Sequence, residues 1–137
     1  IGGPFGRQGE RHHLTLTDEA LTGFDTNLKV VPPFRTESDR RALWTGLADG
    51  TIDAIVSDHH PHDVESKHLE FDQAEFGAVG LETAFAVANT FNEGQLSLEE
   101  LIKKFTDAPR NLLRLPTPVL AEGQPACLTV FDPDLPW

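Results

Sequence analysis

The chain has 137 residues, 39% of them hydrophobic and 24% charged, which is ordinary for a soluble globular domain. Twenty-two acidic residues against eleven basic ones give a net charge of −11, so nucleic acid and bilayer surfaces are not expected as partners, because both attract basic proteins. The sequence shows neither a membrane-spanning apolar run nor a signal peptide, and its single cysteine, Cys127, excludes a disulfide framework and fits a reducing, cytoplasmic setting.

The first third of the chain predicts short elements. Residues 1–11 contain four glycines and a proline and are expected to form a loop or a disordered leader. The segment His12–Thr17 alternates enough for a short strand, and Asp18–Leu21 opens a helical turn. A short apolar run from Leu28 to Val31 ends at the proline pair that follows.

A helix followed by a buried strand is the clearest unit of the sequence. Thr36 and Asp39 match a capping box, and Gly50 is well placed to end the helix. The run Ile52–Val56 is short, β-branched and apolar on both faces, which is typical of a strand in a parallel sheet covered by helices. The expected apolar stripe of the helix is Ala42, Leu43 and Leu47, with Trp44 as an open candidate.

Beyond this strand the pattern is a long polar connection, residues 59–78, and then helices. The first helix is predicted from Leu81 to Gly94, and the second begins after Ser97 in another capping box. Thr106 and the residues after it are expected to cap a third helix, and Leu128–Phe131 is expected to form a final strand. A parallel sheet needs more strands than these, so either another chain supplies them or the sequence is part of something larger.

The residues that carry chemistry follow the buried strand. Asp58 lies just past its carboxyl end, the edge at which α/β proteins build their sites. It could act as a metal ligand or a general base, or it could be a structural acid at a strand end. His60 and His62 have a spacing that suits zinc in a strand, but the intervening Pro61 favours a turn and weakens that interpretation.

Other candidates carry weaker signals. Phe76 and Gly77 come shortly before a predicted helix, where exposed backbone N–H groups bind carboxylates. The remaining histidines and two arginines are more simply interpreted as core, loop or surface residues: His12, His13, His59, His68, Arg35 and Arg110.

Several segments resemble one family. Ser57–His62 resembles the [TS]-D-H-x-P-H segment of the dihydroorotases, in the amidohydrolase superfamily. Five more segments resemble the family, three before this one and two after it, and all occur in the family's order. The resemblance therefore runs from about residue 12 to the end: His12–Glu19, Pro32–Arg35, Asp49–Asp53, Phe76–Ala84 and Glu122–Pro133.

The resemblance implies an α/β fold, the C-terminal part of a metal-dependent (β/α)₈ TIM barrel that ends in a strand of a small β-sandwich domain. Residues 1–11 would be an unmatched leader, 12–115 the last βα units of the barrel, and 116–137 the start of the return to the small domain. The implied reaction interconverts N-carbamoyl-L-aspartate and dihydroorotate in pyrimidine synthesis, with a small-molecule substrate and one or two zinc ions.

The resemblance also assigns roles to residues. Asp58 would be a metal ligand and the general acid/base, taking a proton from the attacking hydroxide and returning it to the leaving nitrogen. His62 would hold the substrate carboxylate, and Phe76 and Gly77 would contact the substrate through their backbone. No metal ligand is implied at His12 or His13, and the family's other ligands lie upstream of anything in this sequence.

The sequence departs from the family at Val31, where asparagine often contacts the substrate. Alternatives therefore stay open: allantoinase or hydantoinase chemistry on the same fold, or a non-catalytic dihydroorotase-like scaffold subunit. The fragment alone is expected to be inactive. Unpaired barrel edges invite association, so a homo-oligomer is also open.

Overall fold

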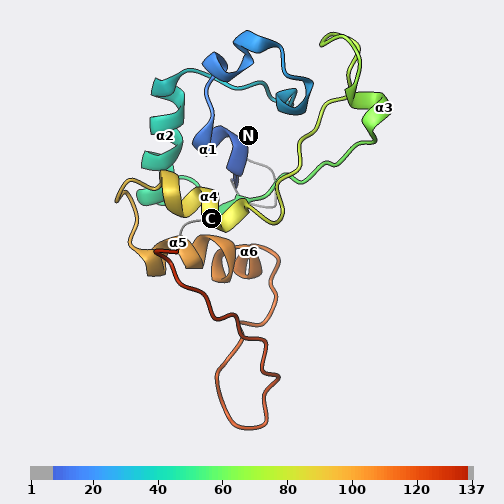
Figure 1. Cartoon of the computed structure of the whole chain (residues 1–137). Coiled ribbons are helices and arrows are strands. Elements are labelled where there is room, and N and C mark those ends of the chain that lie inside the picture. Colours follow the sequence, from blue (N-terminus) through green and yellow to red (C-terminus); the bar gives the residue numbers. More distant parts are fainter. Residues whose placement is uncertain (1–7, 136–137) are drawn as a thin grey trace.

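The computed structural model describes residues 8–135, with helices packed around a very small sheet (Figure 1). The elements in chain order are β1 (Gln8–Glu10), α1 (Arg11–Thr15), the 3₁₀ turns η1 (Asp18–Gly23) and η2 (Thr26–Leu28), α2 (Glu37–Ala48), β2 (Ala54–Val56), α3 (Val64–Lys67), α4 (Ala84–Phe91), α5 (Leu98–Phe105) and α6 (Asp107–Leu112). Within this described range no helix is both long enough and apolar enough to cross a membrane.

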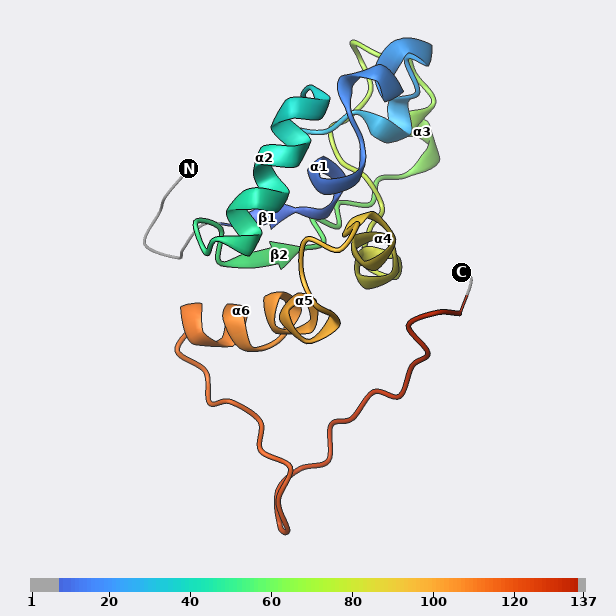
Figure 2. The ribbon, with the colours of Figure 1, turned by 90° about the vertical axis from the view of Figure 1, so that its left-hand side faces the viewer.

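The sheet consists of β1 and β2, which run parallel with Gln8, Gly9 and Glu10 opposite Ala54, Ile55 and Val56. Helices α1 and α2 lie on one side of it and α5 and α6 on the other (Figure 2). The predicted buried parallel strand is therefore confirmed, although it is shorter than the predicted Ile52–Val56. Parallel strands that are covered on both faces are typical of α/β proteins.

The start of the chain differs from the prediction. The expected strand at His12–Thr17 is the helix α1, and the strand lies just before it, within the segment expected to be a loop. All five residues of α1 are buried, so the alternation of residue types does not separate an inner from an outer face. Residues 1–7 of the expected leader lie outside the described range.

The main core joins both layers of helices to β2. Its buried members are Leu14, Trp44, Leu47, Ile55, Ala88, Leu96 and Leu101. The indole Nε1 of Trp44 donates to the carbonyl of Leu14 at 2.9 Å, so this core residue satisfies its one polar atom. On α2, Leu47 is buried as predicted, and Trp44, the open candidate, is buried as well. Ala42 is exposed, so the prediction for it was wrong.

Helix boundaries follow their caps. The predicted capping boxes of α2 and α5 are both formed, by Thr36 with Asp39 and by Ser97 with Glu100. Gly50 takes a φ of +80° after α2, as expected for a residue that ends a helix. The side chain of Thr106 does not cap α6, because its hydroxyl donates to the carbonyl of Ile102 instead.

The predicted strand at Leu128–Phe131 is not formed. After α6 the chain leaves the helices in a long excursion, and its apolar side chains are exposed, Val130 by 99% (Figures 1 and 2). It returns where the ring of Phe131 meets that of Phe85, with centroids 5.1 Å apart. A strand needs a partner for its backbone groups, and the described residues offer none along this stretch.

Candidate active site

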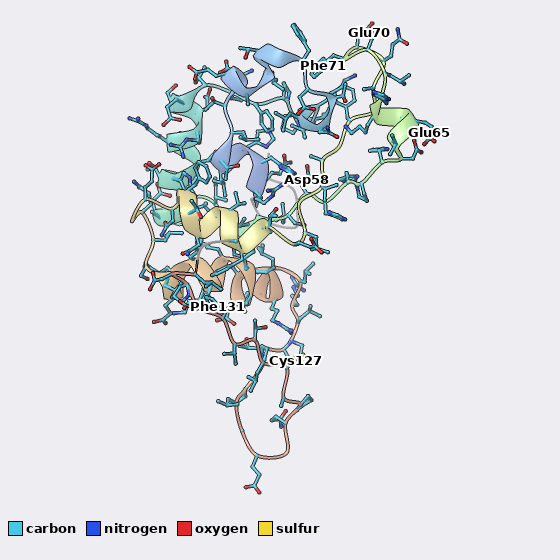
Figure 3. The ribbon with its side chains drawn as sticks, viewed as in Figure 1. Asp58, Glu65, Glu70, Phe71, Cys127 and Phe131 are labelled. Carbon is cyan, nitrogen blue, oxygen red and sulfur yellow. The ribbon has the colours of Figure 1, made fainter. Side chains whose placement is uncertain are left out.

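Asp58 lies two residues beyond the carboxyl end of β2, near the middle of the molecule (Figure 3). Its backbone has a φ of +46°, in the left-handed region that aspartate tolerates better than most residues. The side chain is 24% exposed, and its Oδ1 lies 3.8 Å from Nε2 of the largely exposed His60. The carboxylate is thus held at the sheet edge and remains accessible.

His59 ties this strand end to a distant segment. It forms an isolated parallel bridge with Ala78, and its Nδ1 accepts hydrogen bonds from the N–H groups of Gly80 at 3.1 Å and Leu81 at 3.2 Å. The segment before α4 is therefore fixed beside Asp58. The interpretation of His59 as a simple loop histidine missed this contact.

His62 faces the same segment from the other side of Pro61. Its Nε2 donates to the carbonyl of Phe76 at 2.9 Å, because a carbonyl can only accept. The other ring nitrogen, Nδ1, can then donate to an incoming group only when the imidazole is protonated.

Gly77 is packed where no side chain fits. A Cβ at this position would lie 2.7 Å from the carbonyl oxygen of His60 and 3.0 Å from Cδ2 of His62, and its φ is +145°. Its N–H donates to the carbonyl of Lys29 at 2.8 Å, and α4 begins only at Ala84. The expectation of exposed N–H groups at a helix entrance is therefore wrong for Gly77, because this donor is already used.

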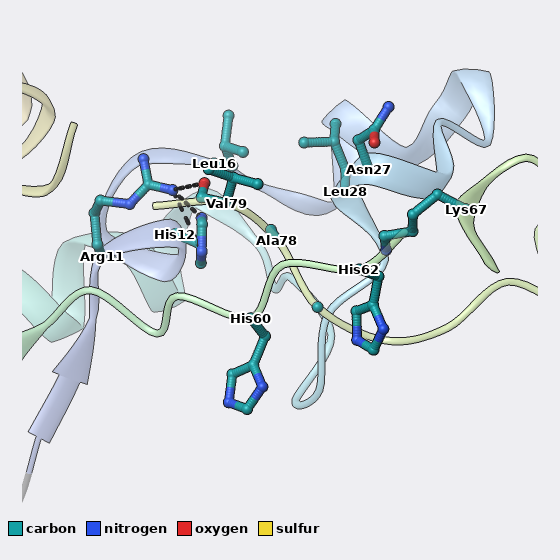
Figure 4. A pocket seen from close by; sticks show the side chains of 11 residues that line it. Arg11, His12, Leu16, Asn27, Leu28, His60, His62, Lys67, Ala78 and Val79 are labelled. Atoms are coloured by element: carbon teal, nitrogen blue, oxygen red, sulfur yellow. Dashed lines mark hydrogen bonds between the residues drawn. The ribbon is translucent and has the colours of Figure 1, made fainter. Parts of the chain in front are cut away.

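His62 and Gly77 line a pocket of about 380 Å³ together with His60, whereas Asp58 and Phe76 are not among its lining residues (Figure 4). Every titratable side chain in its lining is basic, although the chain as a whole has a net charge of −11. The lining residues are Arg11, His12, Leu16, Asn27, Leu28, His60, His62, Lys67, Gly77, Ala78 and Val79. The pocket thus presents a local positive field to whatever enters it.

Arg11 and His12 form the buried wall of the pocket. One terminal nitrogen of Arg11 donates to Nδ1 of His12 at 2.6 Å and to the carbonyl of Val79 at 3.0 Å, and the other donates to Thr83 at 3.0 Å. Burial, followed by the charge of Arg11, lowers the pKa of His12, although the carbonyl and carboxylate of Asp58 oppose this.

Sequence reasoning did not find Arg11 or Lys67. Arg11 lies at the end of a glycine-rich stretch, and Lys67 lies in a polar loop, where lysines are ordinary. The types of these two residues carried no signal, because only the fold brings Arg11 and Lys67 to the same pocket as His62.

The other candidates have ordinary partners. Burial alone would lower the pKa of His13, but the carboxylate of Glu10, 3.0 Å from Nδ1, and the carbonyl of Pro32 together raise it. Arg110 donates to the carbonyl of Pro116 at 3.1 Å, and His68 is exposed. Within residues 8–135, no group of three or more histidine, cysteine, aspartate or glutamate residues could hold a metal ion.

The model of the amidohydrolase family matches residues 11–136. The chain belongs to the amidohydrolase family. Its fold is the C-terminal part of that family's (β/α)₈ barrel, with few of the strands present.

Named relatives are similar over most of the chain. A protein named dihydroorotase from Syntrophus aciditrophicus is 46% identical over 127 residues, 92% of this chain and 30% of the relative. Another dihydroorotase, from Carboxydothermus hydrogenoformans, is 49% identical over 90% of this chain and 30% of its own length. The chain thus spans about 30% of the length of the curated relatives it matches.

Solved structures give the same fold. The L-hydantoinase (dihydropyrimidinase) from Arthrobacter aurescens has a TM-score of 0.71 and 33% identity, covering 78% of this chain and 25% of its own. The dihydroorotase from Saccharomyces cerevisiae in complex with 5-fluoroorotic acid has a TM-score of 0.69 and 21% identity, covering 85% and 33%. At that identity the yeast enzyme supports the fold alone.

Proposed function

We propose that the chain is the C-terminal part of a cytoplasmic dihydroorotase, a hydrolase of cyclic amide C–N bonds in pyrimidine synthesis. The reaction would interconvert N-carbamoyl-L-aspartate and dihydroorotate. The observation that carries the proposal is the 46–49% identity to proteins named dihydroorotase over nine tenths of the chain. In this arrangement residues 12–115 complete the barrel and residues 116–137 begin the return to a small β domain, with the strand β1 extending the barrel part to Gln8.

The charge of the pocket supports an anionic substrate. Both proposed reactants carry carboxylates, and the titratable residues in the lining are all basic. Opposite charges 4 Å apart attract by about 4 kcal/mol at an effective dielectric constant of 20. Hydantoin and allantoin lack a carboxylate, so they would gain less from this field.

Hydantoinase chemistry is the second candidate, because the L-hydantoinase from Arthrobacter aurescens combines a TM-score of 0.71 with 33% identity. Val31, at the position where the dihydroorotase pattern often has asparagine, also weakens the case for dihydroorotate. The basic pocket favours the carboxylate-bearing substrate over this alternative.

The proposed roles follow from where the side chains lie. Asp58 takes a proton at its carboxylate and returns it to the leaving amide nitrogen. His62 donates from Nδ1 to the substrate carboxylate in its protonated form, since Nε2 already donates to Phe76. Phe76 and Gly77 would lie against the substrate with their backbone, although the N–H of Gly77 is already used by the carbonyl of Lys29. The absence of a side chain at Gly77 keeps this backbone close to His60 and His62.

Zinc, as one or two ions, is the proposed cofactor. Asp58 fits as one ligand, because its carboxylate is accessible at the strand end. The part of the chain described here has no group of three ligands, so the others would come from outside it, in an enzyme with the length of the relatives. When bound, zinc supplies Lewis acidity and a hydroxide at neutral pH.

The deciding experiment uses the full-length protein that contains this chain, purified with zinc. We expect it to cyclise N-carbamoyl-L-aspartate and to hydrolyse dihydroorotate, measured by the absorbance of the dihydropyrimidine ring. Turnover only of hydantoins or allantoin would overturn the choice of substrate. A folded, zinc-loaded protein inactive on all three substrate classes would favour the scaffold subunit, and sedimentation of the same sample would show whether it is a homo-oligomer.

A further inference from the structure

Lys29 is a buried cation beside the proposed site. The residue is 7% exposed, and its Nζ donates to the carbonyls of Asp72 at 3.0 Å and Ala74 at 2.6 Å. A buried charge is costly unless it is paired or hydrogen-bonded. In the described part of the chain, its recorded partners are carbonyl oxygens and aromatic rings, all from one loop.

The aromatic partners belong to the same loop. The Nζ of Lys29 lies 4.4 Å from the ring centroid of Phe76 and 5.6 Å from that of Phe71, within the range of cation–π attraction. Phe76 is 51% exposed, so its ring lies at the surface with the Nζ of Lys29 over it. Lys29 therefore holds the side chain as well as the main chain of this loop.

The main chain of Lys29 makes the third attachment. Its carbonyl accepts from the N–H of Gly77 at 2.8 Å, so one residue binds the loop at both ends of the segment 72–77. Between these ends, Nζ of Lys67 donates to the carbonyls of Glu75 at 2.7 Å and Thr26 at 2.8 Å. The loop has little structure of its own: α3 covers only Val64–Lys67, and residues 68–77 form no strand or helix.

We propose that Lys29 is a positioning residue that fixes the segment Phe76–Gly77 against His62 at the pocket. This inference rests on the proposed function, in which those three residues bind the substrate. The carbonyl that His62 contacts is that of Phe76, and Gly77 closes on His60 and His62. A displacement of segment 72–77 would thus disturb substrate binding, whereas Asp58, placed by β2, would keep its position.

The test is Lys29→Met in the full-length protein. Methionine fills much of the same volume but cannot donate to the two carbonyls or attract the rings. We expect KM for dihydroorotate to rise by about tenfold or more and kcat to fall by less than about threefold, because binding residues move and the proton-transfer group does not. Lys29→Arg, which keeps the charge and the donors, should restore much of KM.

Lys104 provides the matched control. Its Nζ also donates to a backbone carbonyl, that of Ile52 at 3.0 Å, but this bond lies away from the pocket. Lys104→Met therefore removes the same kind of contact and should leave KM unchanged. An equal rise in KM in both variants would mean that the loss of Lys29 acts only through general stability, and it would overturn the proposal.

Amide hydrogen exchange separates this proposal from the proposed function. In Lys29→Met we expect faster amide exchange across residues 72–76, because the bonds from Nζ to the carbonyls of Asp72 and Ala74 are lost, with the α2 and α5 amides unchanged. The N–H of Gly77 keeps its acceptor, the main-chain carbonyl of residue 29. Wild-type exchange in that segment, or an unchanged KM, would contradict the role of Lys29. An inactive wild-type protein would refute the proposed function, and the exchange result would still decide whether Lys29 holds the loop.

Discussion

At the scale of single residues, Asp58 combines an exposed functional group with an unusual backbone. Its φ of +46° costs most residues more than it costs aspartate or asparagine, whose short polar side chains tolerate the left-handed region. The turn after β2 thus both selects the residue type and aims its carboxylate. The sequence predicted the importance of this residue, but the left-handed backbone was visible only in the structure.

Asp58→Asn tests the proposed acid/base role. Asparagine has nearly the same side-chain shape as aspartate and tolerates the same left-handed backbone, but it lacks the carboxylate. In the full-length protein, we expect kcat for dihydroorotate hydrolysis to fall by at least about 10²-fold, the usual worth of a general base. The thermal midpoint, measured by circular dichroism, should barely change. Glu65→Gln, at an exposed acid on α3, serves as the control; wild-type turnover in Asp58→Asn would exclude the proposed role.

At the scale of elements, the sequence was most informative where the signal is local. The capping boxes at Thr36 and Ser97 were predicted and are formed, because a cap depends on residues only three positions apart. The start of α4 was predicted at Leu81 but lies at Ala84, since residues before it are held by His59 and Arg11. Long-range contacts of this kind override the apolar period that indicated an earlier start.

The cap of α5 gives a prediction at this scale. Ser97→Ala removes the hydroxyl that accepts from the N–H of Glu100 at 3.3 Å and donates to its carboxylate at 2.7 Å. We expect the free energy of unfolding to fall by about 1 kcal/mol, as measured by urea denaturation of the full-length protein. Ser97→Asp, which keeps an accepting oxygen at the cap, should recover most of the loss; an unaffected Ser97→Ala would show that the cap contributes little.

At the scale of the whole molecule, the sheet is small compared with the helices that pack on it. Two three-residue strands form the entire sheet of the described residues, and the segment after α6 leaves many apolar side chains exposed. Exposed edges and apolar surface promote association. The chain spans about 30% of the length of its relatives, and an open sheet edge is what one part of an amidohydrolase barrel would expose.

The isolated 137-residue chain should therefore not behave as a stable monomer. We expect a broad thermal transition without a cooperative midpoint, and self-association in sedimentation experiments at micromolar concentration. Co-expression with the missing part of a relative should sharpen the transition, because it covers the open edges. A monomer with a sharp, reversible melt would contradict this view of the chain as an incomplete unit.

The sequence by itself determined the family, the buried strand before Asp58 and the caps of two helices, because each depends on neighbouring residues whose types carry the chemistry. Its motifs also marked Asp58, His62, Phe76 and Gly77 as candidate site residues. Only the tertiary structure decided that the pocket is lined by basic residues, that the N–H of Gly77 donates to the carbonyl of Lys29, and that the first strand precedes α1. These features join residues far apart in the chain, whose approach depends on packing and buried hydrogen bonds that no local pattern records.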